Sequence, residues 1–109
     1  LAGGNELAEV ADGDFEMHRV DAADAGLAHA PVEAIRGGDA AHNAAALRAL
    51  LMGTPGPYRD AVLFNAAGAL MVAGEVESWR EGVEEAAEAI DRGLAKALLD
   101  CWIDTVSKA

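Results

Sequence analysis

A single stretch decides the fold of this chain: Tyr58-Arg59-Asp60-Ala61-Val62-Leu63-Phe64-Asn65-Ala66-Ala67-Gly68-Ala69-Leu70-Met71-Val72-Ala73. Apolar side chains would lie on nearly every side of a helix built from it, which predicts that residues 58–73 form the most buried helix. The small residues at 66–69 would let a neighbouring helix approach closely. Asn65 is the polar exception, and we interpret it, together with Asn43, as a source of buried hydrogen bonds between helices.

Two more helices are predicted after this stretch. Ser78 and Glu81 have the spacing of a capping box, so a helix should begin at Trp79 and run to about residue 92. Its glutamate-rich face is interpreted as solvated rather than as a metal site. Gly93 should end it, and a last helix follows over 94–107. The apolar face of that last helix comprises Leu94, Leu98, Cys101, Trp102 and Thr105. Cys101 is interpreted as a buried packing residue.

A shorter helix is predicted upstream, over 40–52, with Asp39 as its N-cap and Gly53 just beyond its end. The glycines before Asp39 resemble a phosphate-binding loop that leads into a helix N-terminus. The Walker lysine is missing, however, and the Asp39 carboxylate would repel a phosphate. We therefore interpret the segment as a helix cap.

The N-terminal region is predicted to form a β-hairpin, with strands over 7–11 and 14–20 and a tight turn at Asp12-Gly13. Two strands alone are marginally stable in water, so we expect other residues to supply the rest of the sheet. Residues 21–38 are expected to be an irregular connector. His18, His29 and His42 show no paired metal-ligand spacing and are interpreted as ordinary histidines.

Composition narrows the possible functions. The chain has 109 residues and a formal net charge of −11, which disfavours binding to nucleic acid. No apolar run approaches the roughly 20 residues of a membrane span. One cysteine excludes an internal disulfide and fits a reducing, cytoplasmic setting. The first residue is Leu1 rather than Met, so we expect a longer protein with a missing N-terminal portion.

Four motifs carry a family resemblance when taken in order: Gly37-Gly38-Asp39-Ala40-Ala41-His42-Asn43-Ala44, Gly56-Pro57-Tyr58-Arg59-Asp60-Ala61-Val62-Leu63-Phe64-Asn65-Ala66-Ala67, Glu81-Gly82-Val83 and Ala89-Ile90-Asp91-Arg92-Gly93-Leu94-Ala95. The pattern resembles the C-terminal part of the anthranilate phosphoribosyltransferases. The resemblance implies an α/β parent fold of the nucleoside phosphorylase and phosphoribosyltransferase type. This chain would contribute a mainly α portion with an N-terminal hairpin and about four helices. Residues 1–38 would belong to the α/β domain and residues 39–109 would be C-terminal helices.

The resemblance also implies a function for the parent protein. That function is phosphoribosyl transfer from phosphoribosyl pyrophosphate to anthranilate in tryptophan biosynthesis, by a homodimer that uses Mg²⁺. The family's Asp-Glu metal motif corresponds here to Asn5 and Glu6, with Gly4 in place of a leucine. Asn5 offers a carbonyl oxygen but no charge, so metal affinity should fall. No catalytic residue is assigned within this chain, and the family's phosphate and anthranilate loops lie upstream of it.

A second interpretation comes from a different functional class. The chain could be a non-catalytic helical interaction or assembly module that kept the family's packing. The substitution at Asn5 and the missing upstream loops support this alternative.

Overall fold

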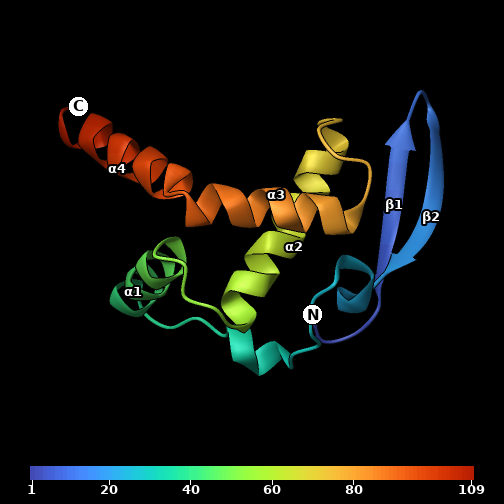
Figure 1. Ribbon diagram of the computed structural model, residues 1–109, viewed down its shortest axis with the longest axis horizontal. Coiled ribbons are helices and arrows are strands. Elements are labelled where there is room, and N and C mark those ends of the chain that lie inside the picture. The colour runs from blue at the N-terminus through green and yellow to red at the C-terminus, as the bar shows by residue number, and fades with distance from the viewer.

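The computed structural model covers residues 1–109 and contains two strands, two short 3-10 turns and four α-helices. Strands β1 (Asn5–Ala11) and β2 (Asp14–Val20) pair in antiparallel fashion, and the helices are α1 (Ala40–Leu51), α2 (Pro57–Val72), α3 (Trp79–Asp91) and α4 (Leu94–Ser107). The predicted mainly helical architecture with an N-terminal hairpin is confirmed. Figure 1 places the hairpin and α4 at opposite ends of the long axis.

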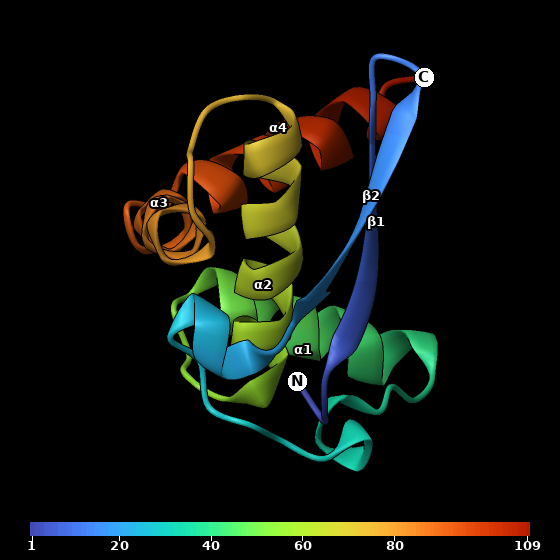
Figure 2. The same cartoon turned by 90° about the vertical axis from the view of Figure 1, so that its right-hand side faces the viewer.

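Helix α2 forms the centre of the molecule, as its apolar sequence predicts. It crosses α3 steeply, and the views of Figures 1 and 2 agree on this arrangement. Ala67, which is fully buried, packs directly against Gly82 where the two helices meet. A Cβ atom at Gly82 would lie 2.7 Å from the Ala67 Cβ, so only glycine fits this position. The prediction that small residues on α2 admit a close neighbour is confirmed.

Much of the core consists of two small clusters, and α2 contributes one buried residue to each. One joins Val20 at the end of β2 to Ala25 and Phe64, with the Trp79 ring packed edge-on against Phe64 at a centroid distance of 5.2 Å. The other joins Leu63 of α2 to Ala86 and Ile90 of α3. The hairpin is therefore anchored to the helices mainly through its C-terminal end.

Helix boundaries follow the predicted caps. The Asp39 carboxylate accepts a hydrogen bond from His42 N at 2.8 Å, and Ser78 Oγ accepts one from Glu81 N at 3.2 Å. The second half of the predicted capping box differs by one residue, because the Glu81 side chain accepts from Glu77 N rather than from Ser78 N. Gly93 ends α3 with a φ of +79°, in the left-handed region that favours glycine.

The segment 21–38 is more ordered than the predicted irregular connector. It contains the 3-10 turns η1 (Ala22–Ala25) and η2 (Val32–Ile35). The side chains of Asp21 and Asp24 form a reciprocal capping box around η1, which explains the local order. Ala22 and Ala25 are buried there, so this turn closes the core beneath the hairpin.

The molecule buries few of its residues for its length. Only 11 of 109 residues are buried, and the Cα radius of gyration is 15.5 Å, against about 13 Å for a compact domain of this size. The apolar face predicted for α4 is exposed, with Leu98 at 72% and Trp102 at 66%. Cys101 is also exposed, which corrects its predicted burial. None of the helices combines the length and apolar content needed to cross a bilayer.

Candidate functional site

The candidate site lies at the base of the hairpin, where β1 begins. The predicted strand over 7–11 starts two residues earlier in the structure, so Asn5 and Glu6 belong to β1 rather than to a loop. Asn5 pairs with Val20 and Glu6 pairs with Arg19 across the two-stranded sheet. Successive side chains of a strand point to opposite faces, so Asn5 and Glu6 face away from each other.

The Asn5 side chain faces the helices. Its amide nitrogen Nδ2 donates hydrogen bonds to the carbonyl oxygens of Val20 at 3.2 Å and Gly3 at 3.4 Å. The side chain also borders an open hollow of about 280 Å³ between the hairpin, α2 and α3. The other residues that line this hollow are mostly apolar: Leu1, Leu7, Val20, Phe64, Asn65, Gly68 and Trp79. Asn5 therefore holds the start of β1 to the end of β2.

Glu6 faces the other side of the hairpin and has a cationic neighbour. Its carboxylate lies 3.8 Å from the Arg19 guanidinium, and both side chains are 73% exposed. The same guanidinium lies over Gly4, where an added Cβ would meet Arg19 Nη2 at 2.7 Å. A leucine at position 4, which the resemblance implies for the family, would have to displace Arg19. The glycine thus allows Arg19 to lie beside Glu6.

This arrangement does not fit a metal ion shared by Asn5 and Glu6. Their side chains project from opposite faces, and the Glu6 carboxylate faces a guanidinium. Only Glu6 offers a charged oxygen, whereas Mg²⁺ prefers several oxygen ligands in octahedral geometry. The assignment of these residues to Mg²⁺ stays a prediction.

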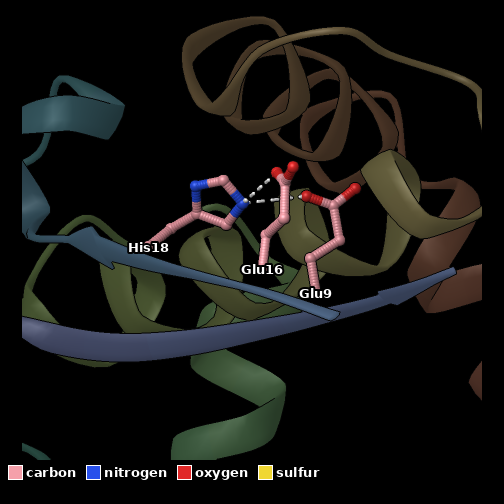
Figure 3. A group of neighbouring side chains, drawn as sticks. All are labelled: Glu9, Glu16 and His18. Atoms are coloured by element: carbon pink, nitrogen blue, oxygen red, sulfur yellow. Dashed lines mark hydrogen bonds and ion pairs between the residues drawn. The ribbon is translucent and has the colours of Figure 1, made fainter. Parts of the chain in front are cut away.

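Sequence spacing missed another group of potential ligands on the same hairpin. Glu9, Glu16 and His18 lie together on one face of the hairpin, as Figure 3 shows. The strand register places Glu6 on the opposite face. His18 Nε2 lies 3.1 Å from a Glu9 carboxylate oxygen and 3.5 Å from one of Glu16. The grouping depends on the cross-strand register that the turn at Asp12-Gly13 sets. The turn itself was predictable, so counting pairs outward from it would have found the cluster.

The glycine-rich segment before α1 has a structural role, because hydrogen bonds hold it against the start of the helix. The Asn43 side chain reaches back from α1, accepting a hydrogen bond from Gly38 N at 2.9 Å and donating one to Gly38 O at 3.1 Å. With the Asp39 cap, these bonds hold the segment against α1, as the interpretation as a helix cap requires. The predicted buried bonds between helices are wrong, since Asn43 and Asn65 are exposed and Asn65 Nδ2 donates to Ala61 O of its own helix.

Arg59 makes a structural ion pair between two helices. Its guanidinium donates to both carboxylate oxygens of Asp91, at 2.9 and 3.0 Å, and so joins the start of α2 to the end of α3. The Arg59 side chain is only 13% exposed, in contrast to 54% for Asp91. The pair therefore fixes the packing of two helices rather than offering a free cation to a ligand.

Comparison of the sequence with known protein families gives a match over most of the chain. Residues 1–96 match the family described as "Glycosyl transferase family, a/b domain". This chain belongs to the glycosyl transferase family. The match includes the hairpin, α1, α2 and α3, so the family's sequence pattern extends across both the candidate site and the helical core.

Curated proteins that are similar in sequence to this chain carry a more specific name. The chain is 74% identical over 103 residues to the anthranilate phosphoribosyltransferase of Novosphingobium aromaticivorans, covering 94% of this chain and 31% of that protein. It is 66% identical over 104 residues to that of Erythrobacter litoralis, covering 95% of this chain and 32% of the relative. The resemblance inferred from the motifs is confirmed. The chain spans about a third of the length of these curated relatives.

Proposed function

We propose that this chain is part of an anthranilate phosphoribosyltransferase. The parent enzyme would transfer the phosphoribosyl group from phosphoribosyl pyrophosphate to anthranilate, as a step of tryptophan biosynthesis. The observation that carries the proposal is the 74% identity to a named relative across nearly the whole chain. The residues 1–96 that match the family give it independent support.

In the proposed reaction, this chain and the rest of the protein would contribute different parts of the active site. Bond cleavage at the ribose C1 builds positive character there, and the protein mainly positions the reactants and stabilises developing charge. Within this chain, the hairpin base and its anchoring core fix the position of Glu6, while the Arg59–Asp91 pair fixes α2 against α3. We propose that the substrate-binding loops come from the remaining portion of the parent protein.

Mg²⁺ belongs to the proposal as the ion that would accompany the diphosphate. Glu6 is the residue we propose as its one carboxylate contact within this chain, and Asn5 would not add a second charge. In a full-length parent, Glu6→Gln should therefore raise the Mg²⁺ concentration needed for half-maximal turnover. Asn5→Asp should leave that concentration unchanged, because the side chain at position 5 projects from the face opposite to Glu6. Steady-state rates across a Mg²⁺ titration measure both variants, and an unchanged titration for Glu6→Gln would contradict the assignment.

A homodimer and a cytoplasmic location complete the proposal. The dimer rests on the family resemblance alone. The location is supported by the single cysteine, Cys101, whose exposed thiol has no partner for an internal disulfide.

The decisive experiment is a chimera. The corresponding segment of the Novosphingobium aromaticivorans relative is replaced by residues 1–109, and the unmodified relative serves as the matched control. We expect the chimera to form the phosphoribosyl product at a rate near that of the control, and the isolated chain to form none. A chimera that folds and assembles like the control but lacks turnover would support the alternative, a non-catalytic assembly module. That alternative draws on the separation of Asn5 from Glu6.

A further inference from the structure

The hairpin brings two like charges face to face. Glu9 and Glu16 are direct cross-strand partners in a ladder of seven residue pairs. Like charges directly opposite each other destabilise an antiparallel pair. The side chain that joins them is His18, whose Nε2 lies 3.1 Å from Glu9 Oε2 and 3.5 Å from Glu16 Oε2. Figure 3 shows both carboxylates on the Nε2 side of the ring.

The donor atoms have the spacing of a coordination shell. One nitrogen and two carboxylate oxygens lie within 4.8 Å of one another. Ligand atoms about 2.0–2.2 Å from a zinc ion in tetrahedral geometry stand roughly 3.3–3.6 Å apart, so the 3.5 Å distance from His18 Nε2 matches and the 3.1 Å distance needs only a small adjustment. The three side chains are 43–78% exposed, which leaves them free to adjust their rotamers around an ion.

The backbone holds the three residues in a fixed relation. The turn residues Asp12 and Gly13 both have positive φ, at 53° and 82°, the pattern of the two-residue turns that match strand twist. This turn fixes the register, and strand alternation then places residues 9, 16 and 18 on one face. The cation nearest in sequence, Arg19, projects from the other face beside Glu6. His18 is thus the only basic side chain paired with these carboxylates.

We propose that Glu9, Glu16 and His18 bind one divalent transition-metal ion of the Zn²⁺ or Co²⁺ class. The imidazole distinguishes this site from one for Mg²⁺, because neutral imidazole suits zinc-like ions whereas Mg²⁺ favours oxygen ligands and water. Nε2 supplies its lone pair and the ring proton resides on Nδ1, with water filling the remaining positions. The ion would neutralise the opposed glutamates and cross-link the two strands. The site is separate from Glu6, which projects from the opposite face.

The test uses the full chain after removal of metal by a chelator. Co²⁺ is titrated by visible absorption and Zn²⁺ by calorimetry, with amide NMR shifts locating the ion. We expect one ion per chain, shifts concentrated on β1 and β2, and a higher melting temperature with Zn²⁺. Mg²⁺ at the same concentration should produce none of these changes. Absence of Co²⁺ and Zn²⁺ binding, or shifts centred elsewhere, would overturn the proposal.

Matched variants test whether Zn²⁺ binds at this site or only non-specifically to an acidic protein. His18→Gln should weaken Zn²⁺ binding by about tenfold or more, since even loss of a residue behind a ligand costs 10–100-fold. His29→Gln is the control, because His29 is an exposed histidine 3.9 Å from the single carboxylate of Asp21. Glu9→Gln and Glu16→Gln remove the repulsion, so they should fold at least as well yet bind less tightly. Equal Zn²⁺ affinity in the wild type and all three site variants would refute the site.

Discussion

At the scale of single residues, a glycine and an alanine set the spacing between α2 and α3. A Cβ atom added at Gly82 would lie 2.7 Å from the Ala67 Cβ and 2.8 Å from its Cα. A flexible side chain could move away from such an atom, but a backbone atom cannot do so without shifting the helix. The spacing of α2 and α3 therefore depends on the absence of a side chain at position 82.

Gly82→Ala should destabilise the chain by about 1–3 kcal/mol, the usual cost of overpacking a core. This cost outweighs the gain of up to about 1 kcal/mol that alanine brings to a helix interior. Gly68→Ala is the matched control, because its Cβ would meet the Trp79 ring at an ordinary 3.4 Å. The control should be neutral or stabilising. Urea unfolding of both variants gives the comparison, and equal stability would contradict the packing argument.

The residue scale also shows why the candidate site was only partly predictable. The sequence places Asn5 and Glu6 side by side, but it does not show that the strand begins at Asn5 and so separates their side chains. The neighbouring Arg19 comes from the opposite strand, 13 positions along the chain from Glu6. Interactions of this kind depend on register, which becomes available only once both strands and their turn are placed.

At the scale of elements, local signals predicted the helices well. Caps and glycine stops act within a few residues of the boundary that they set, so Asp39, Ser78 and Gly93 could be identified from sequence alone. The face that a helix buries depends instead on neighbours distant in sequence. The apolar face of α4 was predictable as a pattern, but its exposure in this structure was not.

Helix α1 offers a test of capping at this scale. The Asp39 carboxylate accepts from His42 N at 2.8 Å, and α1 has only one buried residue, Leu50, to hold it in place. Asp39→Ala should therefore lower the free energy of unfolding by about 1 kcal/mol, whereas Asp39→Asn should change it little because asparagine caps equally well. Chemical denaturation measures both. A loss of the same size in the asparagine variant would show that charge, rather than the capping hydrogen bond, matters.

At the scale of the whole molecule, the notable feature is the amount of apolar surface left uncovered. One face of the hairpin exposes Val10, Phe15 and Met17, and α4 exposes Leu94, Leu98, Trp102 and Val106. Isolated exposed apolar residues are ordinary, but contiguous groups of this kind mark contact surfaces. On the proposed function, the remaining two thirds of the parent enzyme would supply the contacts.

The double substitution Leu98→Gln and Trp102→Gln should affect the isolated chain and the full-length chimera differently. These side chains are 72% and 66% exposed, so their replacement should change the unfolding free energy of the isolated chain by no more than about 0.5 kcal/mol. In the full-length chimera the same change should lower the melting temperature clearly, because burying each large apolar side chain is worth roughly 1.5–3 kcal/mol. Thermal unfolding of the four proteins provides the measurement. Equal melting temperatures for the substituted and unsubstituted chimeras would mean that the rest of the enzyme leaves this face of α4 uncovered.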